Sequence, residues 1–589
     1  MKIVVALLLA LGCSVNFFGY TYGEHKEIGD RAFLKFALAL GDQEFAKVFL
    51  AFTEALRDDG GNYYFADLSV EGGNRVSYGV LNALSGDHQS TPLELEAQLR
   101  TKDSLIQRIV LLHERYIAMG YTAAPDAKLA RMDFGYVLQA AVNLSHFYEY
   151  KHSFQQQFRP FEKSRIRECE DPSLAGAAFG KLGQTNAIDM YVTIHAAAID
   201  LAERSARLLK AGNNGGEKVA SNEKQARQLL HYALLYNAYA DHFLEDAFSS
   251  GHLVVNRTVL ASVTNNKALH DFYSENGTTV LNRNGEIWKA YGDGQLNNTH
   301  ESWRGAHKLE DIAYTGRNQD LDRIVEAVRL SLQDVWNAFQ RAGSDSNYVP
   351  VLQGIPDERD RQADFLMNAF AGLRLVPIPY NSNLPTLFPQ GEVTDAMRQA
   401  NQRLGDREFV RSRIGNSFVL GVNSRLVSAN DLQGFEFRVN AGDIGRKYPH
   451  NAEGGKQGTS DYWLGYTASY SFGDVGVKEN GASQLRHYWQ LKGGIRSNLD
   501  RWITNKRFVG FYSYNEVGVQ YLDNRAEVIF VPSLGLQLGS LFKINYYNMP
   551  GWLRLPAEYI LPLKIRIGTV ISQHEPPKPF SGIDVDFVF

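Results

Sequence analysis

The first half of the chain repeats apolar residues at spacings of three and four. The segment 189–209, DMYVTIHAAAIDLAERSARLL, shows this period, and its apolar positions fall on one face of a helix. Similar patterns extend over residues 31–57, 95–118, 131–150, 225–248 and 319–341. The pattern therefore predicts a helical domain over about residues 24–345.

The second half changes to a period of two. A proline-bearing stretch at 376–389, VPIPYNSNLPTLFP, separates the two patterns. Beyond about residue 415, apolar and more polar residues alternate, as in 435–440 and 462–472, in roughly eight runs. Turn signals such as LDNR at 522–525 separate the runs. This alternation predicts an antiparallel β domain with one face different from the other.

The chain ends in the alternating sequence SGIDVDFVF, at 581–589. Alternation up to a terminal aromatic residue resembles the last strand of bacterial outer-membrane barrels, in which one strand face meets lipid and the other fills the lumen. A soluble β-sandwich whose last strand ends in Phe589 would show the same alternation. The sequence thus predicts a multidomain α plus β protein, with either an outer-membrane-type barrel or a β-sandwich as its second part.

The first residues indicate export. Lys2 precedes a short apolar run, IVVALLLAL at 3–11, which is shorter than the ~20 residues of a membrane-spanning helix. We therefore expect a signal peptide at 1–23 and an exported protein, either secreted or in the outer membrane. The remaining boundaries are a helical domain at 24–345, a linker with short helices at 346–414 and the β domain at 415–589.

Composition fits a folded protein and gives no sign of a polyanion binder. The chain is 44% hydrophobic and 21% charged, with a formal net charge of −4. Sequence-independent binding of nucleic acid needs many lysines and arginines on one face, so a nucleic-acid partner is unlikely, although it is not excluded. No protein partner is indicated. If Cys13 is removed with the signal peptide, only Cys169 remains and no internal disulfide can form.

Histidine is concentrated in the helical half. Twelve of the fifteen histidines lie at or before residue 307. The sharpest cluster is the segment 240–252, ADHFLEDAFSSGH, which contains His242, Asp246 and His252. Residues four apart share a helix face, and the SSG sequence at 249–251 should end the helix and turn His252 back. Imidazole nitrogen and carboxylate oxygen are common zinc ligands, so the segment predicts a metal site.

This spacing resembles that of the zinc-dependent phospholipases C of bacteria, including clostridial alpha-toxins, and of the related single-strand-specific fungal nucleases. The resemblance covers about residues 20–300 loosely and implies an all-helical domain with up to three zinc ions. It implies that His242 serves the first metal, that Asp246 bridges two metals and that His252 serves the second.

The resemblance also implies further ligands. His25, in the segment TYGEH at 21–25, would bind the third metal. The family's usual N-terminal tryptophan is absent, and Tyr20 or Tyr22 takes its place only if the signal peptide is cleaved there. His146, in NLSHF, matches the family's His-Phe element. The bridging carboxylate that accompanies it is either Asp87 or Asp133.

Several alternatives stay open at these positions. His88 replaces His146 if insertions fall differently. The second metal should also receive a histidine after His252, which His270 provides. Ser274 stands where a carboxylate is expected four residues later, with Asp271 and Glu275 nearby, so the last ligand is open.

The resemblance implies a zinc-dependent phosphodiesterase. Zinc ions can neutralise phosphate oxygens, lower the pKa of a bound water and stabilise the leaving oxygen, while Asp87 or Asp133 orients the attacking water. A β domain that contacts lipid favours a phospholipase C acting on phospholipid at a membrane surface. The alternatives are a nuclease or other phosphodiesterase on the same metal site, or a non-catalytic metal-binding surface protein.

Overall fold

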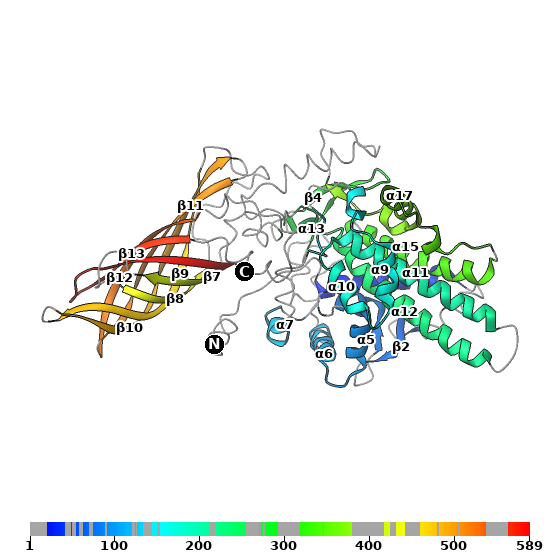
Figure 1. Ribbon diagram of the computed structural model, residues 1–589, viewed down its shortest axis with the longest axis horizontal. Helices are drawn as coiled ribbons and strands as arrows, with labels where there is room; N and C mark the ends of the chain where they lie inside the picture. The colour runs from blue at the N-terminus through cyan, green and yellow to red at the C-terminus, as the bar shows by residue number, and fades with distance from the viewer. Residues whose placement is uncertain are drawn as a thin grey trace. The chain divides into compact units, whose positions relative to one another are not determined.

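The computed structural model consists of two compact units, one mainly helical and one a β-barrel (Figure 1). The helical unit comprises Met1–Val254 and Tyr273–Ala400, and the barrel unit comprises Val255–Phe272 and Asn401–Phe589. The predicted α plus β organisation is therefore confirmed. The structure describes residues 21–41, 49, 55–57, 63–69, 75–86, 88, 91–119, 124, 126–133, 144–149, 154–212, 218–254, 270, 273–274, 277–292, 319–345, 347–379, 417–424, 432–441, 460–479, 482–504, 507–522, 524–537 and 564–588.

Three long helices form the centre of the helical unit: α11 (Ala187–Gly212), α12 (Lys218–Asp246) and α15 (Gln319–Ser344). Many small side chains are buried along α11 and α12, and small residues let helix axes approach closely. Shorter helices surround them: α2 (Tyr22–Leu40), α4 (Tyr78–Leu84), α5 (Pro92–Arg100), α6 (Leu105–Ala118), α7 (Asp126–Met132), η1 (Gln155–Phe158), α9 (Lys163–Glu170), α10 (Ala175–Leu182) and α13 (Ser250–Val254). Among the described residues, no helix has both the length and the apolar character needed to cross a bilayer.

Two of the predicted helical segments are only partly helical. In 31–57, α2 ends at Leu40 because Gly41 adopts φ +56°, and Ala55–Arg57 forms strand β1. In 131–150, α7 ends at Met132 and residues 144–149 form turns. The backbone there bonds to other segments, since Ala187 N–H donates to the carbonyl of Phe147 and Tyr148 N–H donates to that of His252. The helix prediction is wrong for these turns because tertiary partners satisfy the backbone.

The helical unit also contains two small sheets. Strand β2 (Tyr63–Ser69) pairs with β1 and with β3 (Arg75–Ser77). Strand β4 (Thr278–Leu281) pairs with β5 (Ile287–Ala290) and with β6 (Ile378–Pro379). Because β6 completes this sheet, the compact unit continues past residue 345, where the linker was expected to begin. Three further elements in that region are α16 (Val351–Gly354), α17 (Arg359–Ala369) and η3 (Ala371–Arg374).

Eight antiparallel strands close into a barrel in the second unit. They are β7 (Ser417–Ser424), β8 (Leu432–Ala441), β9 (Ser460–Glu479), β10 (Ala482–Thr504), β11 (Arg507–Leu522), β12 (Arg525–Gln537), β13 (Lys564–Ser572) and β14 (Lys578–Val588). The last strand pairs with the first, from Val588 opposite Ser417 to Ser581 opposite Ser424. The alternation is thus that of a barrel, and the sandwich alternative is wrong because the sheet closes on itself.

The predicted turn at 522–525 joins β11 to β12. Leu522 pairs with Arg525 across the turn, and Asn524 adopts φ +61°, a conformation that asparagine tolerates.

The alternation places apolar side chains outside the barrel and polar ones inside. The exposed apolar set includes Tyr462, Tyr466, Tyr470, Phe472, Leu491, Ile495, Val517, Leu534, Ile565, Ile567 and Ile583. Inside, Glu436 lies 2.5 Å from Arg438, 2.7 Å from Lys492 and 2.8 Å from Arg566. A separate buried apolar cluster contains Leu432, Val475, Tyr488, Leu522, Ile529, Val531, Val570 and Phe580. This barrel is therefore filled by side chains, and its outer face is more apolar than that of a typical soluble domain.

Candidate metal centre

The C-terminal end of α12 carries the centre of the site. His242 and Asp246 are four residues apart and share a helix face, with Nε2 of the histidine 3.6 Å from Oδ2 of the aspartate. The helix ends at Asp246, and the new helix α13 begins at Ser250. This turn brings Nδ1 of His252 to 3.4 Å from Oδ1 of Asp246, as the sequence predicted.

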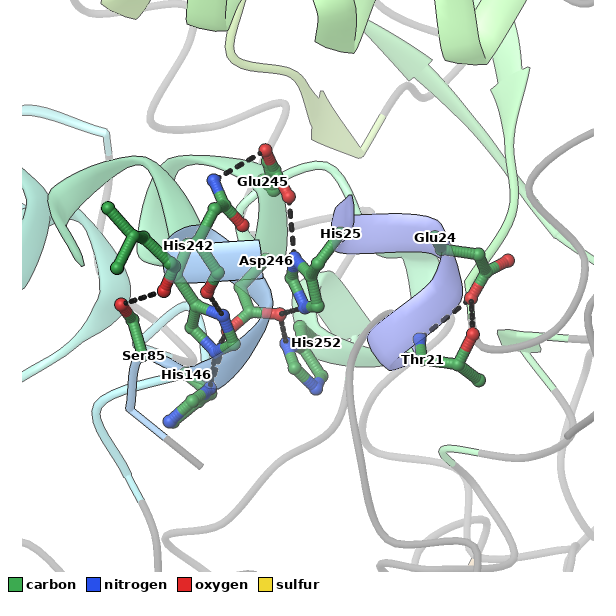
Figure 2. Close-up of polar contacts among 11 residues, drawn as sticks. Thr21, Glu24, His25, Ser85, His146, His242, Glu245, Asp246 and His252 are labelled. Carbon is green, nitrogen blue, oxygen red and sulfur yellow. Dashed lines mark hydrogen bonds and ion pairs between the residues drawn. The ribbon is translucent and has the colours of Figure 1, made fainter. Parts of the chain in front are cut away.

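Both carboxylate oxygens of Asp246 face histidines (Figure 2). Oδ1 lies 3.8 Å from Nε2 of His25 and 3.4 Å from Nδ1 of His252. Oδ2 accepts a hydrogen bond of 2.5 Å from Nδ1 of His146 and lies 3.6 Å from Nε2 of His242. Three segments that are distant in sequence, those of His25, His146 and 242–252, therefore meet around one buried carboxylate.

His25 is held at the start of α2. The backbone N–H of Thr21 donates to the carboxylate of Glu24 at 2.8 Å, which is half of a capping box. The N–H of His25 donates to the carbonyl of Thr21 at 3.0 Å, so the ring projects from the first turn. Its Nδ1 forms a hydrogen bond of 2.5 Å with Oε2 of Glu245. This bond leaves Nε2 directed towards Asp246.

His242 also directs its Nε2 towards Asp246, but a different contact orients its ring. Its Nδ1 donates to the backbone carbonyl of Asn82 at 3.1 Å, so Nε2 is the nitrogen that faces Asp246. The rings of His25 and His242 stack with centroids 4.1 Å apart. Metal-ligating histidines characteristically donate their other ring N–H to a carbonyl or carboxylate.

The surrounding chain approaches this group closely. Gly86 has φ +73°, and a Cβ there would lie 2.9 Å from Phe243, 3.0 Å from His146 and 3.1 Å from His242. Glycine alone therefore suits this position in both backbone angle and space. On the other side, the ring of Phe147 covers that of His252, with centroids 4.3 Å apart.

The site is fully buried, and burial dominates its electrostatics. Burial lowers the pKa of His25 well below its usual range, and His242 and His146 lower it further. Burial also lowers the pKa of His242 to about 3, against the opposing effect of Asp246. Burial raises the pKa of Glu245 well above its usual range, and Asp241 and Asp246 add to this rise. Neutral imidazoles keep a ring lone pair, which is the form that binds metal.

The donor spacing suits a metal ion. His25, His242 and Asp246 each offer a ligand atom, and these atoms lie within 4.8 Å of one another. Ligand atoms at about 2.0–2.2 Å from a tetrahedral zinc ion lie roughly 3.3–3.5 Å apart. The separations of 3.4–3.8 Å between Asp246 and three of its histidines are close to that range. Two nitrogen donors and one oxygen donor match the ligand preference of zinc.

Of the eight predicted site residues, five meet at this centre: His25, His146, His242, Asp246 and His252. Asp133 follows α7 and lies 3.3 Å from Nδ1 of His88, the alternative to His146. His270 is buried. The other predicted carboxylate, Asp87, lies outside the described residues.

The remaining alternatives have separate positions. Ser274 is buried, whereas Asp271 and Glu275 lie outside the described residues. Tyr22 is buried in the first turn of α2 and stacks on His113 with centroids 3.6 Å apart. Of the other helical histidines, His195 binds Asn237 at 2.6 Å and His231 lies 3.1 Å from Glu96.

Sequence reasoning missed two residues of this centre, Asn82 and Glu245. Oε1 of Glu245 accepts a bond of 2.9 Å from Nδ2 of Asn82, across 163 residues of sequence. The one sequence signal that could have indicated Glu245 is its position directly before Asp246, the predicted bridging ligand. Asn82 has no metal-ligand chemistry of its own and carries no such signal.

Comparison of the chain with protein-family models, with curated proteins and with solved structures gives no match.

Proposed function

We propose that the helical unit is a zinc-dependent phosphodiesterase of the phospholipase C type, held at an outer membrane by the barrel. The observation that carries this proposal is the position of Asp246, whose two oxygens each face two histidines. A carboxylate in this position is suited to bridge two metal ions. Metal binding at Oδ2 would replace its present hydrogen bond with His146.

The residues of the chain have separable roles in this proposal. His25, His146, His242 and His252 bind metal through ring nitrogens, and Asp246 bridges. Bound zinc would supply Lewis acidity towards a phosphodiester and would acidify water. Asp87 and Asp133 are the candidate carboxylates for orienting the attacking water, and His88 lies 3.3 Å from Asp133, where it can hold that carboxylate in place. A third metal would need ligands beyond the five that meet here.

The outer face of the barrel supports phospholipid as the substrate class. Large apolar side chains such as Leu491, Ile567 and Leu534 are 55–64% exposed, while charged residues are buried inside. Such a surface suits the hydrocarbon region of an outer membrane. A phosphodiesterase held there would meet phospholipid head groups at high local concentration. This argument favours a lipid substrate over nucleic acid.

The test compares two substrates and two variants. The full chain in detergent should hydrolyse phosphatidylcholine with release of phosphocholine, and a chelator should abolish this activity until zinc is restored. Asp246→Asn should lose activity by at least about a hundredfold, because it removes the shared ligand. Asp189→Asn, a buried aspartate on α11 that lies 3.7 Å from Arg165, is the matched control and should stay active.

Three outcomes would contradict this assignment. Zinc-dependent cleavage of single-stranded DNA without phospholipid cleavage would assign a nuclease on the same site. A zinc-loaded chain that cleaves neither substrate would indicate a metal-binding surface protein. Full activity in Asp246→Asn would remove the proposed bridge.

A further inference from the structure

Asn82 is connected to two of the histidines that face Asp246. Its side-chain amide donates to Oε1 of Glu245 at 2.9 Å, and Oε2 of the same glutamate binds Nδ1 of His25 at 2.5 Å. Its backbone carbonyl accepts from Nδ1 of His242 at 3.1 Å. Asn82 of α4 is therefore hydrogen-bonded to His242 directly and to His25 through Glu245.

These contacts bear on which ring nitrogen carries the lone pair. A backbone carbonyl only accepts, so Nδ1 of His242 carries the proton and Nε2 carries the lone pair. A zinc ion on Nε2 of His25 likewise requires the proton on Nδ1, with Glu245 as the accepting carboxylate. The two Nε2 atoms lie 3.8 Å and 3.6 Å from the oxygens of Asp246. His25, His242 and Asp246 are also the three residues whose donor atoms cluster closely enough to hold one ion.

We propose that Asn82 and Glu245 are positioning residues, which form a clamp that fixes the tautomer and orientation of His25 and His242 for a zinc ion. This inference rests on the proposed zinc site. Neither clamp residue touches substrate. The clamp acts through donor and acceptor order: His25 N–H to Glu245, Asn82 N–H to Glu245, and His242 N–H to the carbonyl of Asn82.

The same two helices carry a second polar contact, which offers a control. One helical turn before the clamp, the hydroxyl of Tyr78 on α4 donates to Asp241 on α12 at 2.6 Å. Both residues are fully buried, as are Asn82 and Glu245. Tyr78→Phe therefore removes a comparable buried hydrogen bond at the same helix interface without touching the clamp.

Variants that change the hydrogen-bond donors and acceptors of Asn82 and Glu245 test the proposal. In Glu245→Leu the side-chain acceptor of both Asn82 and His25 is lost, and in Asn82→Asp two carboxylates face each other. The double variant Asn82→Asp with Glu245→Gln restores the order, because the glutamine can accept from His25 and donate to the new aspartate. Zinc dissociation constants are measured on the full chain by competition with a chelating dye. The metal-free unfolding midpoint is recorded for each variant.

Each single variant should weaken zinc binding about 10–100-fold, while Tyr78→Phe binds as the wild type does and the double variant regains most of the loss. Wild-type affinity in Glu245→Leu would overturn the clamp. So would a double variant as weak as the singles, or a Tyr78→Phe variant that loses as much affinity as they do. A wild-type chain that binds no zinc would instead overturn the proposed function, and the clamp with it.

Discussion

The two units bury carboxylates beside different partners. In the barrel, Glu436 lies within 2.8 Å of Arg438, Lys492 and Arg566. In the helical unit, Asp246 is equally buried and faces four histidines. Glu436 is thus surrounded by permanent cations, whereas Asp246 faces imidazole rings, of which His25 and His242 have pKa values lowered by burial.

This difference distinguishes a cluster that compensates its own charge from a candidate metal site. A buried carboxylate is stable when cations and hydrogen bonds compensate its charge, as arginine and lysine do for Glu436. His242, with its pKa lowered to about 3 by burial, supplies no positive charge at pH 7. The cluster around Asp246 is thus suited to an added cation, whereas the cluster around Glu436 needs none.

The largest expected effect is a loss of barrel stability when the charge of Glu436 is removed. In Glu436→Gln, three buried cations lose their shared anion, so we expect the barrel to lose about 3–5 kcal/mol of unfolding free energy. Urea unfolding in detergent, followed by gel mobility, measures this loss. Glu575→Gln is the control, because its pair with Lys578 is partly exposed. Equal stability of the two variants would show that the barrel cluster is not needed for its stability.

A third buried carboxyl group, that of Asp320, accepts hydrogen bonds from neutral N–H groups, and its contribution to stability should depend on pH. Asp320 receives hydrogen bonds of 2.9 Å from Nε1 of Trp288 and 3.0 Å from the N–H of Tyr291. Burial raises its pKa to about 7, although these bonds and Arg323 oppose the rise. The folded state then holds the proton more tightly than the unfolded state does. Its contribution to stability is therefore present at low pH and is lost as the pH rises towards 7.

Between pH 5 and pH 7 the loss due to Asp320 should be about 2–3 kcal/mol. Asp320→Asn should reduce the pH slope of the unfolding free energy by this amount, because the amide does not titrate. Denaturant unfolding of both proteins at the two pH values measures it. An unchanged slope in the variant would assign the pH dependence to other groups.

The smallest expected effect compares two glycines with positive φ. Gly86→Ala adds left-handed backbone strain of about 1–2 kcal/mol and also brings a Cβ to 2.9–3.1 Å from Phe243, His146 and His242. Gly285→Ala, at φ +79° with nothing within 4 Å, adds only the strain. Both should lower the unfolding midpoint, but only Gly86→Ala should also weaken zinc binding. Equal zinc affinity in the two variants would contradict the close packing described for the site.

The sequence predicted those features that depend on local periodicity. The period of two implied strands with two unlike faces, but a barrel and a sandwich share that alternation, so only the pairing of β14 with β7 decides between them. The helix prediction failed at 144–149, where backbone groups bond to α11 and to His252.

The same limit applies to the site. His242, Asp246 and His252 were found because a segment of eleven residues contains all three. His25 and His146 were suggested by the family resemblance, and the structure brings both to Asp246. Asn82 and Glu245 escaped notice because their contact joins residues 163 apart, which no local pattern indicates.

The most direct test of the central claim is the zinc content of the full chain after equilibration with zinc and removal of excess metal. If Asp246 bridges two ions, elemental analysis should give about two to three zinc ions per wild-type chain. The same measurement on Asp246→Asn should give fewer than one, while Glu436→Gln should bind as much as the wild type. A wild-type chain that holds one zinc ion or none would contradict the bridged site.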